Sequence, residues 1–358
     1  MRKSFSVYLV MATFIFLSFP YLAFGSPSIT EVTGDFSHNK QLTIKGSSFG
    51  NKNPAKPYLW APFDGSLSPS ELGIVTSWSG VDHMGYSSNE GVAGSGCLKA
   101  TDNSGVWTAN VNGFAWNALN QKMYLFRKIK KNFAVDDDLN WKVWRLWAIN
   151  FSLPNTYIQI GNGCFYTEGG VMPRCAYLTD KTSARGVINE WKTDEIIIKS
   201  NSALDQADAT FEFWVNGALA GHAPYSDYMT HTFKMRDADH DTDMTMNFVV
   251  HGVKANTTFP DDYRYWADDV YLDTTWARVM IGNASTLASS THREIQIPSA
   301  WTDGSITITI NQGTFAQGTN AYLFVIDADG NASPGYPITI GGSGSKTIRA
   351  PAGLRVIK

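Results

Sequence analysis

Apolar and polar residues alternate with a period of two through most of this chain. Residues 305–310 read Ser-Ile-Thr-Ile-Thr-Ile, and residues 41–45 alternate in the same way. Residues 211–215 alternate up to Asn216-Gly217, a pair that favours a tight hairpin turn. Almost no segment keeps helical spacing over three turns. Because successive side chains of a strand point to opposite faces, the sequence predicts an all-β protein.

The composition supports this class and excludes two others. Hydrophobic residues make up 43% of the chain and charged residues 17%, which is too apolar for a disordered protein. The net charge is −3, without the clustered Lys and Arg of a nucleic-acid binder, so we expect no nucleic-acid partner. There are 12 Trp, 15 Tyr and 31 Gly. Such chains are often secreted and often contact sugars.

The N-terminus has the three parts of a secretory signal peptide. A basic start at Arg2 and Lys3 precedes an apolar run over residues 6–24, and Ala23 and Gly25 supply small residues before a cut. The alternative is an N-terminal membrane anchor, which Pro20 and the small residues disfavour. We therefore predict a signal peptide over 1–25 and no membrane span after cleavage. The protein is expected to be secreted or at the cell surface, in the extracellular space or the periplasm.

Three cysteines fit an exported protein. Cys164 and Cys175 flank a Gly-Gly turn, and in an oxidising compartment they are expected to close a hairpin as a disulfide. Cys97 is left over, and we expect it to be a buried thiol. No C-x-x-C pair is present, so thiolate metal sites are not predicted.

The first strands resemble the opening of an IPT/TIG immunoglobulin-like domain, which has a P-x-I strand and an I-x-G-x-x-F-G turn. The matching residues are Pro27, Ile29, Ile44, Gly46, Phe49 and Gly50. The strands that normally follow in such a domain are missing directly after Gly50. The sequence from residue 276 onward resembles them, as if the domain resumed there. The resemblance implies an immunoglobulin-like β-sandwich.

Two strands alone would expose too much edge to be stable, which predicts a discontinuous domain. We expect it to comprise residues 27–56 and 276–342, with a larger domain inserted at 57–275. The alternative is a short N-terminal hairpin and an independent C-terminal sandwich. Residues 343–358 are Gly/Ser-rich and then contain Pro, and they are predicted to be a flexible tail.

The insert resembles the concanavalin A-like jelly roll of legume-type lectins, laminin-G-like modules, glucanases and several polysaccharide lyases. The likeness lies in the two long strands of segment 124–147, which ends in the Trp-rich residues 140–147, in the strand pair 190–195 and 211–217, and in the closing strand 266–273. The expected fold is therefore a concanavalin A-like jelly-roll sandwich plus a smaller immunoglobulin-like sandwich. The resemblance implies a ligand lying across a concave sheet.

Aromatic and polar residues of the insert are candidates for binding a sugar, because Trp and Tyr stack on sugar rings while polar groups bond hydroxyls. Strict alternation places Trp141, Val143, Arg145 and Trp147 on one face of a strand. An Arg between Trp residues suits acidic sugars, since guanidinium binds carboxylate bidentately. The alternative is that the Trp residues fill the core. The candidate ligand-binding residues are Trp141, Arg145, Trp147, Asn247, His251, Tyr263 and Tyr265.

If the protein is a lyase, Arg127, Arg145, His251 and Tyr265 are the candidate catalytic residues. β-Elimination needs a cation to neutralise the uronate carboxylate, and a His or Tyr pair to take the α-proton and protonate the leaving oxygen. The paired-carboxylate signature of glucanases is absent, because Glu212 is followed by Trp214 and Asn216. A glycosidase of that kind is disfavoured.

Asp64 with Asp268 or Asp269 is the candidate metal site. In the jelly roll that the insert resembles, the first and last strands are neighbours, and related sandwiches often hold a structural Ca²⁺ there. Carboxylate oxygens are the ligands that Ca²⁺ prefers. The sequence leaves open whether Ca²⁺ is bound.

The first functional hypothesis is a secreted carbohydrate-binding, lectin-like or adhesive protein whose partner is a polysaccharide or a cell-surface glycan. The second is a polysaccharide lyase that cleaves uronate-containing glycans. The third is a structural component of the cell surface. The glycan, the oligomeric state and the presence of catalysis are left open at this stage.

Overall fold

The structure is a computed structural model that describes residues 25–65, 67–78, 81–103, 107–116, 118–135, 141–148, 155–159, 164–168, 176–178, 180–223, 235, 244–249, 251–252 and 260–347. It describes the backbone alone for residues 77–78, 112–113, 116, 147–148, 155–157, 159, 164–168, 176–177, 181, 222–223, 244–249, 251–252 and 343–347. The segment 1–24, which covers nearly all of the predicted signal peptide, lies outside the described residues. None of the described helices has the length and apolar character that crossing a bilayer requires.

The chain forms two antiparallel β-sandwiches, so the all-β prediction is confirmed. The smaller one, here called the small sandwich, has the strand order β25-β24-β21-β22-β23-β2-β1-β26. Its strands are β1 (Ser28–Asp35), β2 (Gln41–Ser47), β21 (Arg278–Gly282), β22 (Arg293–Thr302), β23 (Ser305–Thr309), β24 (Asn320–Ile326), β25 (Tyr336–Thr339) and β26 (Ser343–Thr347).

The large sandwich has two sheets. The sheet that packs on the small sandwich is here called the docked sheet. Its order is β17-β16-β15-β10-β20-β8-β7, with β3 also on β20. Its strands are β3 (Leu59–Ala61), β7 (Met84–Ser87), β8 (Cys97–Ala100), β10 (Lys122–Lys131), β15 (Lys192–Lys199), β16 (Thr210–Val215), β17 (Ala218–Ala223) and β20 (Tyr265–Asp273).

The other sheet of the large sandwich is here called the far sheet. Its order is β14-β13-β12-β11-β18-β9-β4, with β19 also on β11. Its strands are β4 (Ile74–Val75), β9 (Ala109–Trp116), β11 (Trp141–Ala148), β12 (Asn155–Gln159), β13 (Cys164–Glu168), β14 (Ala176–Tyr177), β18 (Met244–Val249) and β19 (His251–Gly252). The remaining elements are β5 (Ser77–Trp78), β6 (Val81–Asp82), η1 (Val92–Gly94) and α1 (Lys181–Arg185).

The small sandwich is built from both ends of the described chain. β2 pairs with β23, and β1 pairs with β26, so strands more than 250 positions apart share one sheet. This pairing is what a discontinuous domain requires, while the boundaries at 56/57 and 275/276 and the IPT/TIG type stay predictions. The tail predicted from residue 343 is wrong for 343–347, which form β26. Small Gly and Ser residues do not prevent an extended backbone, and β1 offers a free edge to pair with.

The turn after β2 explains why the sequence has glycine at positions 46 and 50 and phenylalanine at position 49. Phe49 is buried in the core of the small sandwich. A Cβ at Gly46 would lie 2.5 Å from the Phe49 ring and 1.9 Å from the Ser28 carbonyl oxygen, so only glycine fits. Gly50 has φ +68°, a conformation that favours glycine. This turn therefore places the Phe49 ring in the core of the small sandwich.

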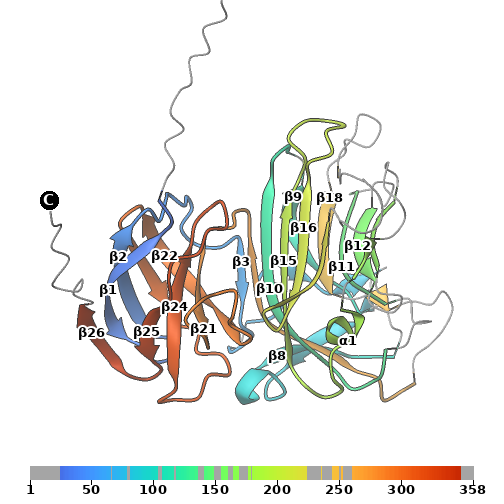
Figure 1. The fold of residues 1–358 in the computed structure, drawn as a ribbon. Coiled ribbons are helices and arrows are strands. Elements are labelled where there is room, and N and C mark those ends of the chain that lie inside the picture. Colours follow the sequence, from blue (N-terminus) through green and yellow to red (C-terminus); the bar gives the residue numbers. More distant parts are fainter. Residues whose placement is uncertain are drawn as a thin grey trace, which may run out of the picture.

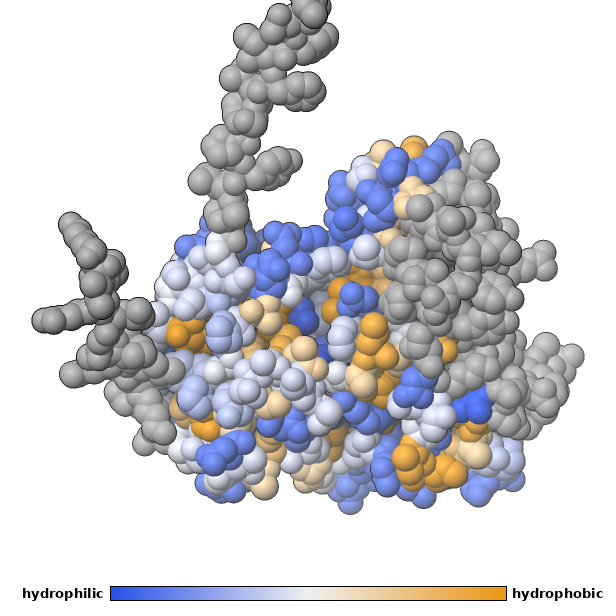
Figure 2. Space-filling view, viewed as in Figure 1, coloured by the Kyte–Doolittle hydropathy of each residue, from blue (hydrophilic) through white to orange (hydrophobic). Residues whose placement is uncertain are grey.

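Alternation along β10 fixes how the two sandwiches meet. Met123 and Leu125 belong to the core of the large sandwich, whereas Tyr124 and Phe126 point the other way, into a cluster with Met280 and other residues of the small sandwich. β10 and β15 therefore lie between the small sandwich and the far sheet (Figure 1). The strand is covered on both faces, which is why all four residues of Met123–Phe126 are apolar or aromatic and why Arg127 and Lys128, which follow them, pair with buried carboxylates. The outer surface in Figure 2 is instead a mosaic of hydrophilic and apolar residues.

Buried charges also join the sandwiches. Lys128 Nζ of β10 lies 2.6 Å from Glu294 Oε1 of β22, and Arg293 lies 3.1 Å from Glu195 Oε1 of β15. Tyr124 donates its hydroxyl to Glu195 at 2.8 Å. Lys128 is 2% exposed and Glu195 is 1% exposed. Lys128, Glu294, Arg293 and Glu195 therefore each have a partner of opposite charge across the interface, so removing one of them would leave a buried charge unpaired.

The cysteine predictions have two outcomes. Cys97 is a free, fully buried thiol, as expected. Burial raises its pKa to about 12, so the reactive thiolate is disfavoured. Cys164 lies in β13 and Cys175 lies outside the described residues, so their disulfide stays a prediction.

Candidate functional site

A β-bulge in β11 decides which of its side chains face outward. The register with β12 shifts between Lys142 and Trp144, which adds one residue to β11 and reverses the alternation. Trp144 is consequently buried in the core while Arg145 stays partly exposed, as does Lys142 before the bulge. The prediction that Trp141, Val143 and Arg145 share a face is therefore wrong. Trp147 lies in β11, and its side chain is outside the described part of the structure.

Trp141 is a core residue and not a ligand-binding residue. It is 1% exposed and contacts Phe133 at 4.8 Å between ring centroids and Tyr265 at 5.6 Å. Tyr263 also packs inward, because its ring stacks on Phe133 at 4.6 Å with an 8° angle between the planes. The sequence motif placed these rings on a binding face, but they fill one end of the sandwich.

Two of the four candidate lyase residues lie inside the large sandwich. Arg127 is 0% exposed and pairs with Asp194 at 3.0 Å. Tyr265 is also 0% exposed, its hydroxyl has no hydrogen-bond partner, and burial raises its pKa. Both belong to the docked sheet, whereas Arg145 and His251 belong to the far sheet. The predicted catalytic set is therefore not assembled.

The far sheet brings other polar positions into register with Arg145. In β18, Asn247 pairs directly with Arg145, and Asn110 of β9 pairs with Asn247. On the other side, Tyr157 of β12 pairs with Arg145. Residues directly opposite on neighbouring strands share a face, so these positions form one row across four strands.

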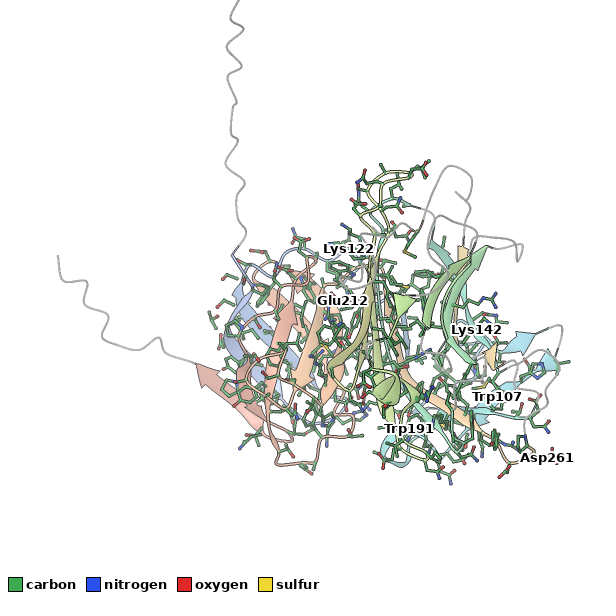
Figure 3. The ribbon with its side chains drawn as sticks, turned by 45° about the vertical axis from the view of Figure 1, so that its right-hand side comes forward. Trp107, Lys122, Lys142, Trp191, Glu212 and Asp261 are labelled. Atoms are coloured by element: carbon green, nitrogen blue, oxygen red, sulfur yellow. The ribbon has the colours of Figure 1, made fainter. Side chains whose placement is uncertain are left out.

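A second row crosses the same sheet at Lys142. His251 of β19 and Gln159 of β12 both pair with Lys142. Lys142 lies on the side of the large sandwich away from the small sandwich (Figure 3). The register thus places Arg145, Asn247 and His251 on neighbouring strands of one sheet, while their role in binding stays a prediction. It adds Lys142 and Gln159, which the sequence reading missed because their place depends on the bulge.

The two rows give the far sheet a defined chemistry. Arg145 can bind a carboxylate bidentately and Lys142 adds a second positive charge. Asn110 adds an amide, and the other positions of the rows are amide, imidazole and phenol residue types, which bond sugar hydroxyls. We here call these two rows the polar face.

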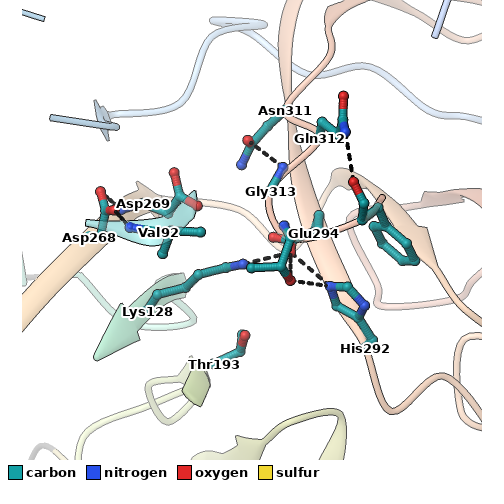
Figure 4. Close-up of polar contacts among 12 residues, drawn as sticks. Val92, Lys128, Thr193, Asp268, Asp269, His292, Glu294, Asn311, Gln312 and Gly313 are labelled. Carbon is teal, nitrogen blue, oxygen red and sulfur yellow. Dashed lines mark hydrogen bonds and ion pairs between the residues drawn. The ribbon is translucent and has the colours of Figure 1, made fainter. Parts of the chain in front are cut away.

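A second candidate site is a cavity of about 400 Å³ between the sandwiches. The large sandwich contributes Asp64 and Asp269, and the small sandwich contributes His38, Asn311 and a neighbouring loop. Figure 4 shows Asp269 and Asn311 approaching each other from the two sandwiches. His38 Nε2 lies 3.7 Å from Asp64 Oδ2.

Asp268 does not line this cavity but hydrogen-bonds to Val92 and Ser95, which do. One carboxylate oxygen accepts the backbone N–H of Val92 at 2.8 Å and the hydroxyl of Ser95 at 3.3 Å, and the other accepts the N–H of Asp269 at 2.8 Å. Burial raises the pKa of Asp268 and of Asp269, and the charge of Asp269 raises that of Asp268 further.

Asp64 and Asp269 both line this polar cavity, and carboxylate oxygens are the ligands that a hard cation such as Ca²⁺ prefers. Asp268 is not among the residues that line the cavity, and its role as a ligand stays a prediction. Within the described ranges, no group of three or more His, Cys, Asp or Glu could hold a metal ion. Main-chain and amide oxygens would have to complete the coordination.

No protein-family model matches the chain, and no curated protein matches its sequence. Among solved structures it is similar to a cellulose-induced protein, Cip1, with 13% identity, a TM-score of 0.40, and coverage of 61% of this chain and 97% of that one. A carbohydrate esterase from a Shiga toxin-encoding bacteriophage follows, with 16% identity, a TM-score of 0.36, and 60% and 97% coverage. An alginate lyase from Corynebacterium sp. has 9% identity, a TM-score of 0.29, and 62% and 94% coverage. All three names refer to carbohydrates, but likeness at this level assigns no activity.

Proposed function

We propose that the protein is a secreted or cell-surface carbohydrate-binding protein whose ligand is a polysaccharide with carboxylate groups. The ligand lies across the polar face of the far sheet. The observation that carries this proposal is the register that places Arg145 and Lys142, two partly exposed cations, among polar positions of four neighbouring strands. Cations on one face select acidic over neutral glycans.

The position of the small sandwich supports the same face. It covers the outer side of the docked sheet, where Lys128 and Glu195 are buried and paired. A glycan chain needs an accessible surface on which several sugar rings can lie. The partly exposed Lys142 and Arg145 offer that surface on the far sheet.

Calorimetric titration with oligosaccharides of alginate and pectate, and with neutral glucan oligosaccharides, tests the proposal. Arg145→Ala should weaken binding of the acidic glycans by about 10-fold or more, since a hydrogen bond to a charged group contributes about 1.5–3 kcal/mol. Lys99→Ala, which removes a partly exposed cation from β8, is the matched control and should leave affinity unchanged. Equal binding of neutral glycans, or an Arg145→Ala protein that binds like the wild type, would refute the proposal.

β-Elimination at the same face is the second candidate function. The register pairs His251 with Lys142, which favours this function because the position of a residue able to act as a general base is then next to that of a cation able to neutralise the uronate carboxylate. His251 takes the α-proton, a carbon–carbon double bond forms, the glycosidic C–O bond breaks, and Tyr157 supplies a proton to the leaving oxygen. Ultraviolet absorbance of the unsaturated product, abolished in His251→Ala and Tyr157→Phe, is the expected result. Absence of that product on all uronate glycans would leave a binding protein.

A Ca²⁺ ion at Asp64 and Asp269 supports the fold in this proposal. Adding CaCl₂ should raise the Tm of the wild type after EDTA treatment, because a ligand that binds the folded state stabilises it. Asp64→Asn should abolish the shift. Equal Tm values with CaCl₂ and with EDTA would reject the ion.

Concentration-dependent self-association without any glycan binding would instead favour a structural surface component.

A further inference from the structure

A small cavity lies between the two sheets of the large sandwich. Lys131 and Tyr265 line it from the docked sheet, and Trp141 and Val143 line it from the far sheet. Lys131 pairs directly with Tyr265 in the register of β10 and β20, so the two side chains share a face. The cavity has a volume of about 10 Å³, which is the space that one water-sized species occupies. It therefore admits a ligand of one heavy atom and excludes a sugar ring.

Two hydrogen-bond donors that line this cavity have no acceptor. The indole Nε1 of Trp141 and the hydroxyl of Tyr265 are both buried without a hydrogen-bond partner. The indole N–H can act only as a donor. Buried polar groups are nearly always hydrogen-bonded in native proteins. Two unsatisfied donors at one cavity therefore point to a hydrogen-bond acceptor inside it.

Lys131 places a buried positive charge at the same cavity. Its side chain is 5% exposed, and its ammonium donates to the carbonyl oxygens of Phe133 at 2.9 Å and Gly186 at 3.1 Å. Within the described part of the chain it has no carboxylate partner. Burial and the charge of Lys192 lower the pKa of Lys131 to about 8, so the ammonium form still predominates at pH 7. A buried cation of this kind is costly unless a negative charge lies beside it.

The other charged residues at the cavity leave the balance positive. Lys192 and Arg185 also line it. Asp194 pairs with Lys192 at 2.5 Å and with Arg127 at 3.0 Å, so this carboxylate already serves two buried cations. Glu190 is exposed, and it is the one carboxylate among the described residues that line the cavity. The acceptor that the two donors require is therefore expected to carry a negative charge.

We propose that this cavity binds one small inorganic anion of the size of chloride. The anion accepts hydrogen bonds from Trp141 Nε1 and from the Tyr265 hydroxyl, and it is the counter-ion of Lys131. A water molecule would accept the same two bonds but would leave the Lys131 ammonium without a negative charge. The site lies inside the large sandwich, so it does not depend on the glycan proposed for the polar face.

Thermal unfolding of the full chain at pH 7 tests the proposal, with sodium gluconate replaced stepwise by NaCl at fixed ionic strength. Gluconate is too large for the cavity. The Tm should rise with chloride and then level off, because a ligand that binds the folded state stabilises it. At ten times the dissociation constant the rise should be about 2–4 °C. A Tm that does not respond to chloride, or that changes without saturation, overturns the proposal.

Variants locate the chloride effect. Tyr265→Phe keeps the ring that contacts Trp141 and removes one donor, and it should weaken the apparent chloride affinity by about 10-fold. In gluconate this variant should be at least as stable as the wild type, because the hydroxyl then has no acceptor to lose. Tyr86→Phe, which removes an exposed hydroxyl, is the matched control and should respond to chloride like the wild type.

Lys131→Met gives an independent readout of the charge, since it keeps a long side chain and removes the ammonium. The chloride response should disappear in this variant. A response equal to that of the wild type, in Tyr265→Phe or in Lys131→Met, overturns the site. If neither variant folds, the chloride titration of the wild type still decides.

Discussion

The two outer faces of the large sandwich differ in burial. On the docked sheet, Tyr124, Lys128 and Glu195 point outward and are buried beneath the small sandwich. On the far sheet, Lys142 and Arg145 point outward and stay partly exposed. Both faces combine charged and polar residues, so residue type alone does not separate them. What separates them is burial, because the charges of the docked sheet are buried and paired across the interface with the small sandwich, whereas Lys142 and Arg145 are partly exposed.

This difference teaches how to interpret a charge in a β-sandwich. Lys128 and Arg293 each lie within 3.1 Å of a buried carboxylate of the other sandwich, which is the arrangement of a structural contact. The polar face instead collects cations, amides, an imidazole and a phenol in register. A face of that kind offers donors to a ligand from outside the chain.

The largest effect should come from breaking the docked face. Glu294→Ala leaves Lys128 buried without its carboxylate, and we expect the free energy of unfolding to fall by about 3–5 kcal/mol. Urea unfolding followed by Trp fluorescence measures it. The double variant Lys128→Met/Glu294→Leu should recover much of the loss. A change below about 1 kcal/mol for Glu294→Ala would mean that the pair is exposed in solution.

A smaller effect on stability should distinguish the core residues of β11 from its partly exposed residues. Trp141→Phe removes part of a core side chain and should lower stability by about 1–3 kcal/mol. Glycan affinity should not change, because Trp141 packs on Phe133 and Tyr265 inside the sandwich. Parallel unfolding and glycan titrations check both halves of the prediction. A loss of glycan affinity at unchanged stability would mean that Trp141 contacts the glycan.

Removing one hydroxyl from the docked face should have a milder effect. Tyr124→Phe deletes the hydrogen bond to Glu195, while Arg293 still pairs with that carboxylate. The expected loss is about 1–2 kcal/mol by urea unfolding. A stability equal to that of the wild type would indicate that Arg293 alone satisfies Glu195.

The smallest effect concerns the thiol of Cys97 on β8. Because burial raises its pKa to about 12, alkylation at pH 8 should be negligible in the native protein and rapid in urea. Mass spectrometry of the Cys97 peptide measures both rates. Burial favours the protonated thiol, so its contribution to stability is present below the ordinary value of 9.0 and is lost as the pH rises toward 12. Fast native labelling would show that this end of the docked sheet opens.

Local patterns predicted the local structure well. Residues 211–215 form β16, with Phe211, Phe213 and Val215 buried. Asn216 and Gly217 both have positive φ, as their hairpin turn requires. These features depend only on neighbours along the chain, so periodicity and turn chemistry suffice to predict them.

The candidate site was predicted only in part, because it depends on contacts between distant strands. Arg145, Asn247 and His251 were identified by residue type, and the register does gather them. The bulge after Lys142 has no signature in the alternation, so the Trp141 face was assigned wrongly. Arg127 and Tyr265 were misplaced for a related reason, since nothing in the sequence tells which side of a fully buried strand faces the core.

The large sandwich is spliced between β2 and β21, and its first and last strands run side by side because β3 pairs with β20. The chain therefore crosses between the sandwiches twice, at adjacent points. Two neighbouring connections between the sandwiches resist twisting better than one connection would. A force on a polymer bound to the large sandwich would therefore be transmitted to the small sandwich, and the two sandwiches would move together. A single protease cut in either crossing would still leave the two halves of the molecule connected.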